Sequence, residues 1–251
     1  MKRRLLATLV LVALLFVPGA PSVADDAGFS EVERAEIERV IQEYIRENPE
    51  IILEAIQIIQ GRQRQAAAER QQRVMEERSD EIYSDPGSPV GGNPIGDVTV
   101  VEFFDYQCPH CRAMTPRMDR LLEEDKNIRV VYKEWPVLGP VSALAARVAL
   151  AARKQGAAKY LDLHGALMSI QDRLNIDLVY GAAEDVGLDI EQLKRDMKDP
   201  DISAVLARNS DLAAALGLTG TPGFVIGDQL VPGEIDFDTL KGLIDDARRG
   251  G

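Results

Sequence analysis

The residues best suited to covalent chemistry are Cys108 and Cys111, the only two cysteines in the 251-residue chain. They belong to the motif Cys108-Pro109-His110-Cys111, which follows an apolar, β-branched and aromatic run at 98–104 that predicts a buried strand. Pro109 suits the first position of a helix, because its missing N–H has no partner there anyway. We therefore expect Cys108 at a helix N-terminus, where free N–H groups and the helix dipole stabilise an anionic thiolate.

An easily ionised thiol in this motif predicts thiol-disulfide exchange. Cysteines in Cys-x-x-Cys motifs have pKa values of about 3.5 to 7.5, against about 8.5 for a free thiol. A stabilised thiolate also makes the matching disulfide an oxidant, and a protonated His110 acts in the same direction. We expect Cys108 to be the nucleophile and Cys111 the resolving thiol, with no cofactor other than their redox-active disulfide.

Other uses of the two cysteines fit the sequence less well. A purely structural disulfide across so short a loop removes only about 2 kcal/mol of chain entropy. Zinc needs a second ligand pair, and the chain has only two histidines, His110 and His164. Covalent haem needs a histidine where Arg112 stands. Two thiolates at Cys108 and Cys111 suit Cu(I), although no Met-rich or His-rich tract accompanies them, so a Cu(I)-binding protein is the alternative class.

Two separate stretches carry a family resemblance. Residues 102–111, EFFDYQCPHC, resemble the active-site segment of the DsbA family of thioredoxin-fold thiol oxidoreductases, and residues 220–227, GTPGFVIG, resemble its cis-proline loop and following strand. The resemblance covers residues 97–251. It implies an α/β thioredoxin fold with an inserted helical domain at about 139–218.

The resemblance also implies roles for individual residues. Thr221-Pro222 is expected to be cis and to dock an extended substrate strand, with an ordinary turn as the alternative. Glu102 matches the family's buried acid, which assists proton transfer to or from Cys111. A carboxyl on a buried strand is costly unless it is paired or protonated, and Lys133 on the next strand is the expected partner. Alternatively, both side chains lie at strand ends and face solvent.

The N-terminus predicts export. Residues 1–24 combine three basic residues, an apolar run at 5–17 and a small-x-small cleavage site at 22–24, which is typical of a secretory signal peptide. The run is shorter than the roughly 20 residues that span a bilayer, so an uncleaved anchor is the less favoured alternative. Export implies an oxidising compartment, the periplasm. The net charge of −12 argues against a nucleic-acid partner.

Residues 25–81 predict a helical arm that joins copies of the chain. Ser30 and Glu33 form a capping-box pattern, and apolar residues recur at helical spacing through 37–45 and again through 51–59. Gly61 is a candidate flexion point, and the polar stretch 62–78 predicts a solvated connecting helix. The apolar stripe either folds onto its own catalytic domain or buries against copies of itself.

The arm carries a second resemblance. Residues 43–50, EYIRENPE, resemble the N-terminal extension of the suppressor of copper sensitivity protein C (ScsC) group, a DsbA-like branch. In members with this extension it builds oligomers, commonly trimers. The resemblance therefore implies a homo-oligomer, with a trimer as first choice, through about Ser30–Gln60.

The remaining residues, 82–251, are expected to form the DsbA-like domain. A linker is predicted at 85–97, strands at 128–133, 224–226 and 229–231, and helices at 142–154, 157–169, 178–186, 190–198, 201–216 and 237–248. His164 is interpreted as an ordinary buried histidine on one of these helices.

These predictions combine into a periplasmic thiol-disulfide oxidoreductase that acts through mixed disulfides, favoured as a disulfide isomerase or reductase. Its expected partners are misfolded or oxidised exported proteins and a membrane protein that recycles the cysteines. A monomeric DsbA-like dithiol oxidase and a Cu(I)-binding copper-tolerance protein are the alternatives.

Overall fold

The computed structural model of the protein describes residues 28–250, and the predicted signal peptide lies outside them. The chain divides into two compact units between Ile59 and Gln60. None of the helices between residues 28 and 250 combines the length and the apolarity needed to span a bilayer.

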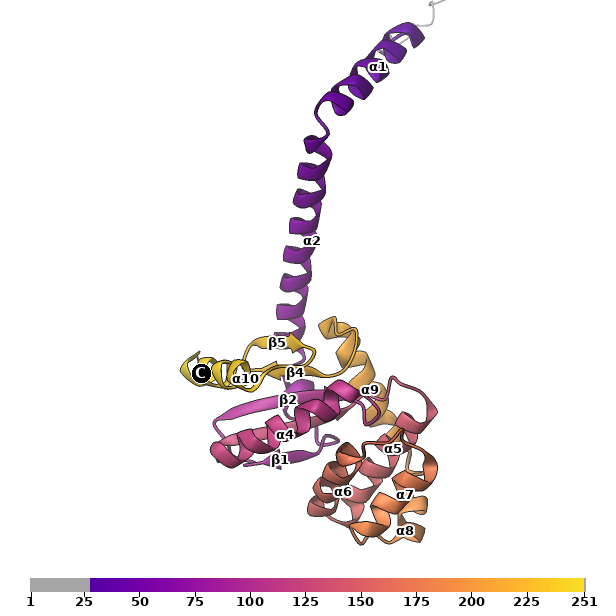
Figure 1. Cartoon of the computed structure of the whole chain (residues 1–251), viewed down its shortest axis with the longest axis vertical. Coiled ribbons are helices and arrows are strands. Elements are labelled where there is room, and N and C mark those ends of the chain that lie inside the picture. Colours follow the sequence, from indigo (N-terminus) through magenta and orange to yellow (C-terminus); the bar gives the residue numbers. More distant parts are fainter. Residues whose placement is uncertain (1–27, 251) are drawn as a thin grey trace, which may run out of the picture. The chain divides into compact units, whose positions relative to one another are not determined.

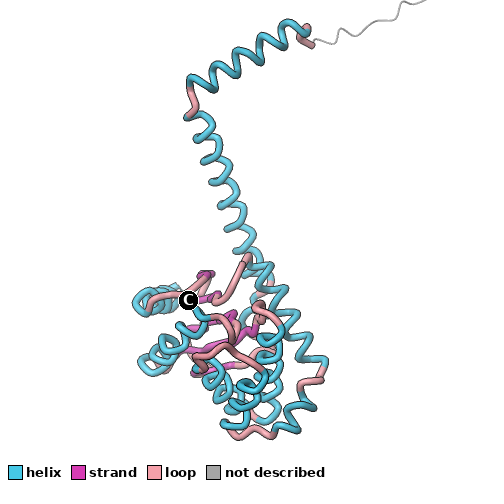
Figure 2. The backbone as a smooth tube through the Cα atoms, turned by 45° about the vertical axis from the view of Figure 1, so that its right-hand side comes forward, coloured by secondary structure: helices cyan, strands magenta, loops and turns pink. Residues whose placement is uncertain are grey.

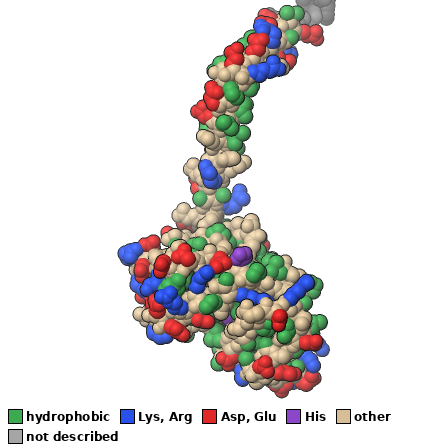
Figure 3. Space-filling model, in the orientation of Figure 1, with side chains coloured by type: hydrophobic (Ala, Val, Ile, Leu, Met, Phe, Trp, Pro, Cys, Tyr) green, Lys and Arg blue, Asp and Glu red, His purple; other side chains and the backbone are tan. Residues whose placement is uncertain are grey.

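The first unit contains α1 (Glu31–Glu47) and the first turns of α2 (Glu50–Glu77). The Ser30 hydroxyl accepts the N–H of Glu33, and the Glu33 carboxylate accepts the N–H of Ser30, which confirms the predicted capping box. Gly61 was a candidate flexion point. In the structure α2 continues through it without a break. Exposed hydrophobic side chains follow both helices (Figure 3): Val32, Ile37, Val40, Ile41, Tyr44, Ile45, Ile52, Leu53, Ile56, Ile58 and Ile59.

The second unit is built around one five-stranded sheet (Figures 1 and 2). Its strands lie in the order β1-β3-β2-β4-β5, and only the central pair β2 and β3 is parallel. Their bounds are β1 (Val90–Gly92), β2 (Val98–Phe104), β3 (Ile128–Glu134), β4 (Gly223–Ile226) and β5 (Gln229–Pro232). The stretch predicted as a linker, 85–97, thus contains an edge strand. Two of its three residues are glycines, which have low β-propensity, so pairing with β3 rather than local sequence makes it a strand.

Helices cover the sheet and extend beyond it. Their bounds are α3 (Ser79–Tyr83), α4 (Pro109–Glu124), α5 (Pro140–Ala152), the 3-10 helix η1 (Arg153–Gln155), α6 (Ala157–Ser169), α7 (Ile176–Asp185), α8 (Ile190–Asp196), α9 (Pro200–Leu216) and α10 (Phe237–Gly250). Helices α5 to α8 pack on one another beside the sheet (Figure 1), in the segment predicted as the helical insertion. α5 starts at Pro140, two residues before the start predicted at 142, and the hydroxyl of Ser142 donates to Asp105, as described below.

Alternation along β2 separates two hydrophobic clusters, one on each face of the sheet. Val100 and Phe104 pack in the cluster that includes residues of α4 and α10. Val101 and Phe103 pack in the other cluster, with Met75 from the end of α2, Ile82 from α3 and part of α9. In β2 and β3, residues two positions apart in the sequence therefore share a face, and neighbouring residues point to opposite faces, one beneath α4 and one away from it.

Candidate active site

The cysteine pair lies at the start of α4. Cys108 is the N-cap residue, with φ −72° and ψ 119°, and Pro109 is the first helical residue, as the sequence predicts. Cys111 lies in the first turn. Both cysteines are free thiols; Cys108 is 5% exposed and Cys111 is fully buried. Cys108 is therefore the sulfur that a partner can reach.

The surroundings drive the two thiols toward opposite protonation states. The pKa of Cys108 is lowered to about 5, first because the Cys111 thiol donates a hydrogen bond to its thiolate, and then through the Thr221 hydroxyl and the N–H groups at the helix start. Burial raises the pKa of Cys111 far above its usual value, and the Cys108 thiolate and the charge of Glu102 add to that rise. At neutral pH, the pair holds one thiolate and one thiol.

The second motif lies directly beside the first. The Thr221-Pro222 peptide is cis, and the Cys108 sulfur lies 3.2 Å from the carbonyl oxygen of Thr221. The Pro222 carbonyl accepts the N–H of Gly233 at 2.8 Å. The fold therefore brings together two stretches more than a hundred residues apart, and it places backbone of the proline loop at the reactive sulfur.

Glu102 lies on the face of the sheet beneath α4. It is 4% exposed, and burial alone raises its pKa to about 8. Its charge contributes to the raised pKa of Cys111, which places the carboxyl in the electrostatic neighbourhood of the resolving thiol. Glu102 is thus a buried acid that holds its proton at neutral pH.

Lys133 is not the partner of Glu102, contrary to the expectation from sequence. In the parallel register Glu102 pairs with Tyr132, and Lys133 pairs with Phe103, so Lys133 points to the opposite face. There its ammonium donates to the Glu81 carbonyl at 2.6 Å and to the Ser88 hydroxyl at 2.8 Å, and it lies 3.7 Å from the Asp85 carboxylate. Lys133 ties α3 and the following segment to the sheet.

His110 is the exposed member of the motif, and it has a partner that the sequence did not reveal. Its Nδ1 lies 2.9 Å from a carboxylate oxygen of Glu234, whose other oxygen lies 2.7 Å from Arg117. The hydrogen bond to Glu234 and the nearby Cys108 thiolate raise the pKa of His110. Glu234 stands in the loop after β5, outside any motif, so no local pattern could have identified it.

Asp105 is a second residue that sequence reasoning missed. Its carboxylate is buried and joins the active-site turn to the segment before α5, where it accepts hydrogen bonds from the N–H groups of Gln107, Val137 and Leu138 and from the Ser142 hydroxyl, at 2.7 to 2.9 Å. An aspartate that accepts the N–H two residues further on forms an Asx turn. An aspartate directly after a predicted strand could therefore have indicated this turn from the sequence.

The second histidine takes no direct part in this site. His164 is buried among aromatic side chains, and its Nδ1 lies 3.2 Å from the Tyr106 hydroxyl. Burial lowers its pKa to about 3, so the ring is uncharged, in agreement with the interpretation of His164 as a structural histidine. Within residues 28–250, we find no group of three or more His, Cys, Asp or Glu side chains arranged to hold a metal ion.

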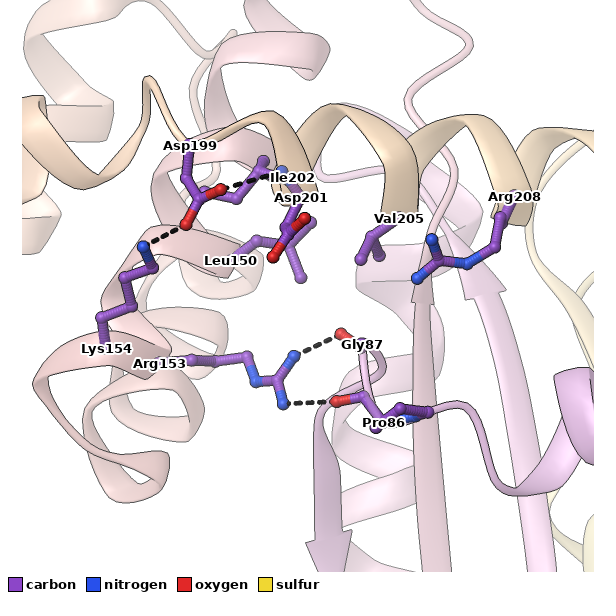
Figure 4. Close-up of a pocket in the computed structure, with 10 residues that line it drawn as sticks. All are labelled: Pro86, Gly87, Leu150, Arg153, Lys154, Asp199, Asp201, Ile202, Val205 and Arg208. Carbon is purple, nitrogen blue, oxygen red and sulfur yellow. Dashed lines mark hydrogen bonds and ion pairs between the residues drawn. The ribbon is translucent and has the colours of Figure 1, made fainter.

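A pocket of about 550 Å³ lies away from the cysteine pair, between the segment at Pro86-Gly87 and helices α5 and α9 (Figure 4). Arg153 crosses it and donates to the carbonyls of Pro86 and Gly87, and Lys154 pairs with Asp199. Arg153 thus joins the segment before β1 to the helical insertion, whereas the Lys154–Asp199 pair lies within the insertion.

Family comparisons agree with this geometry. Residues 99–245 match the DSBA-like thioredoxin domain, and residues 33–66 match the copper resistance protein ScsC N-terminal domain. The structure is similar to a thioredoxin-like oxidoreductase from Silicibacter pomeroyi DSS-3, with 49% identity and a TM-score of 0.66 over 68% of this chain and 98% of that one. It is also similar to Proteus mirabilis ScsC in a transitional conformation, with 28% identity and a TM-score of 0.66 over 90% and 99% of the two chains.

Among curated sequences, the Na(+)/H(+) antiporter NhaA 1 of Salinispora arenicola is 30% identical over 163 residues, which cover 64% of this chain and 25% of the antiporter. The chain thus spans about a quarter of the length of that relative. The expected fold, a DsbA-like thioredoxin fold preceded by a helical arm, is confirmed by the family matches and the solved structures. The chain belongs to the DsbA-like thioredoxin-domain family of thiol-disulfide oxidoreductases.

Proposed function

We propose that this protein is an exported, periplasmic thiol-disulfide oxidoreductase that acts as a disulfide isomerase or reductase on misfolded or oxidised exported proteins. The observation that carries the proposal is the pairing of a thiol of low pKa, Cys108, with a buried thiol of raised pKa, Cys111, one helical turn away. A reactive thiolate next to a thiol that keeps its proton suits attack on a disulfide followed by controlled release.

In the reductive direction, the Cys108 thiolate attacks one sulfur of a substrate disulfide. The substrate S–S bond breaks, one substrate sulfur leaves as a thiolate, and a mixed disulfide with Cys108 forms. Cys111 then loses its proton and attacks the Cys108 sulfur, which releases the second substrate thiol and leaves the enzyme disulfide. Two electrons pass from the enzyme to the substrate, and the membrane partner must return them. In isomerisation, a substrate thiolate attacks the mixed disulfide instead, and Cys108 leaves unchanged.

Glu102 supplies the proton for the opposite direction. When a substrate thiolate attacks the Cys108 sulfur of the enzyme disulfide, Cys111 leaves as a buried thiolate that must be protonated. A carboxyl with a pKa of about 8 still holds its proton at neutral pH and is therefore a suitable donor. By reversibility, the Glu102 carboxylate accepts the proton when Cys111 attacks.

Thr221 and Pro222 form the substrate-docking edge in this proposal. The Thr221 carbonyl lies next to the Cys108 sulfur. An extended peptide that pairs with this backbone would carry its own sulfur to Cys108, as in other cases of strand addition.

The arm supports isomerase work over simple oxidation. Its apolar side chains are exposed on a single chain, and residues 33–66 match an ScsC N-terminal domain. At about 1.5 to 3 kcal/mol for each large side chain buried, the stripe can drive self-association, and we favour a trimer through about Ser30–Gln60. Several active sites around one substrate favour repeated reshuffling over a single donation.

The catalytic proposal is tested by refolding of scrambled ribonuclease together with a glutathione redox titration. We expect the mature protein to restore ribonuclease activity, Cys108→Ser to abolish it, and Cys111→Ser to accumulate mixed disulfides. Equal alkylation rates of the two thiols at mildly acidic pH would contradict the assignment of Cys108 as the nucleophile.

The arm is tested by deleting residues 25–61. The truncated protein should be a monomer by light scattering that still exchanges dithiols but no longer isomerises scrambled ribonuclease. A monomeric full-length protein, or a truncated form that isomerises as well as the intact one, would refute the oligomer proposal.

A further inference from the structure

The loop after β5 connects the two halves of the candidate active site. Gly233 donates its N–H to the Pro222 carbonyl at 2.8 Å, which joins the loop to the proline segment. The next residue, Glu234, binds His110 at 2.9 Å and Arg117 at 2.7 Å, both on α4. Arg117 also donates to the carbonyl of Ile235 at 3.0 Å. The loop is thus anchored at both ends, and the Glu234 carboxylate is held between them.

We propose that Glu234 is a positioning residue: it holds the ring of His110, which stands 124 residues earlier in the chain, in place, and so tunes the reactivity of Cys108. The inference rests on the proposed thiol-disulfide function and assigns that site a tuning residue of its own.

The sign of the effect follows from the charges in contact. A carboxylate alone near a thiolate would repel it. Glu234 instead acts through the imidazolium of His110, which contacts one of its carboxylate oxygens. The guanidinium of Arg117 contacts the other oxygen and offsets the negative charge of the carboxylate. Glu234 is the largest cause of the raised pKa of His110, and attraction to the Cys108 thiolate adds to it. Since that attraction is mutual, a charged His110 also favours the thiolate form of Cys108.

The effect should be smaller than that of Cys111, which is the main cause of the low pKa of Cys108. The His110 side chain is 65% exposed, so solvent screens its charge. The imidazolium stabilises the reduced protein, which contains the thiolate, and not the disulfide form. Glu234 should therefore make the enzyme disulfide slightly more oxidising.

The test compares Glu234→Gln with Glu124→Gln in the full-length protein. Glu124 is a matched control because it also accepts two basic side chains, Arg120 at 2.8 Å and Lys241 at 3.3 Å, and it stands on α4 at the end opposite the cysteines. Cys108 ionisation is followed by ultraviolet thiolate absorbance against pH. We expect Glu234→Gln to raise the pKa of Cys108 by about 0.2 to 0.7 unit and Glu124→Gln to leave it unchanged.

The redox equilibrium with glutathione gives a second readout. The same shift corresponds to a change of about 1.6- to fivefold in the equilibrium constant, or about 6 to 21 mV toward a more reducing potential. An unshifted pKa of Cys108 in Glu234→Gln, or an equal shift in Glu124→Gln, would overturn the inference.

A His110→Ala background shows whether Glu234 acts through the ring. There, Glu234→Gln should leave the pKa of Cys108 unchanged or lower it, because only direct repulsion remains. A rise as large as in the native background would overturn the inference. Because thiolate absorbance needs no substrate, failure of the native protein to act on scrambled ribonuclease would refute the proposed function alone.

Discussion

Buried ionisable side chains at neighbouring positions have different surroundings on the two faces of the central sheet. Glu102 lies on the face beneath α4, where burial raises its pKa to about 8 and its charge is felt by Cys111. Lys133, on the adjacent strand, points to the other face and is surrounded by a carbonyl, a hydroxyl and a carboxylate. Lys133, which has hydrogen-bond and ion-pair partners, stabilises the structure. Glu102, which keeps its proton near the reactive thiols, is available for proton transfer.

The largest effect expected from this comparison is on stability, at Lys133. Lys133→Met would leave the Ser88 hydroxyl, the Asp85 carboxylate and the Glu81 carbonyl without their shared donor. We expect a loss of about 3 kcal/mol in the free energy of unfolding, measured by urea denaturation, with the pKa of Cys108 unchanged.

The control is Lys126→Met. Lys126 is exposed and donates only to the Leu122 carbonyl of its own helix end, so its loss should change stability by less than about 0.5 kcal/mol. A Lys133 variant that keeps its stability but shifts the ionisation of Cys108 would place Lys133 in the active-site network after all.

The next effect is the pH dependence of stability. The pKa of Glu102 is raised in the folded state, so its favourable contribution is full below the unfolded value of about 4.3 and is lost as pH rises to about 8. The pKa of Lys133 is lowered to about 8, chiefly by burial, so its contribution is full above about 10.4 and is lost as pH falls to about 8.

In the disulfide form, in which Cys108 does not titrate, stability should therefore pass through a local minimum near pH 8. Glu102→Gln should reduce the fall on the acid side to the part due to Glu134 and gain about 3 kcal/mol at pH 8 relative to the native protein, measured by denaturation across pH. Glu134, whose pKa burial raises to about 7, adds to the fall only below that value. A native protein whose stability in the disulfide form rises between pH 7 and pH 8 would contradict the burial of Glu102 as an acid.

A smaller effect distinguishes the reduced from the oxidised protein. The pKa of Cys108 is depressed to about 5, so the thiolate stabilises the reduced fold fully above the unfolded value of about 8.5 and loses that contribution as pH falls through 5. At pH 7 the contribution is about 2 to 3 kcal/mol, and we expect the reduced form to melt higher than the oxidised one. The difference should shrink toward pH 5. A higher melting temperature for the oxidised form at pH 7 would show that the thiolate is not stabilised.

The smallest effect is kinetic and concerns Glu102 as a proton donor. Glu102→Gln should slow reduction of the enzyme disulfide by roughly tenfold at pH 7, because Cys111 would leave without a nearby acid. Stopped-flow fluorescence with a small dithiol measures the rate. Glu134→Gln removes a buried acid from the same sheet and should leave that rate unchanged, so an equal slowing in both variants would argue for a general change of the fold.

Short-range patterns alone predicted much of this protein. The Ser30 capping box, the strand before Cys108 and the helix opening at Pro109 depend on residues within one or two turns of each other, so adjacent sequence suffices to define them. The individual helices between residues 139 and 218 followed from the same kind of pattern, whereas their role as an inserted domain came from the family resemblance. Thr221-Pro222 was identified by family resemblance, because nothing in its own neighbours places it near a sulfur.

Only the tertiary structure decided which side chains meet. A one-residue difference in register separates Glu102 from Lys133 on opposite faces, and no local pattern encodes the register between two strands. Edge strand β1 exists through its pairing with β3, and Glu234 reaches His110 because β4 and β5 return the chain to the start of α4. The sequence determined the reactive pair and the elements that carry it, since these depend on neighbours along the chain. Their proton partners depend on contacts between distant segments, which form only when the sheet is assembled.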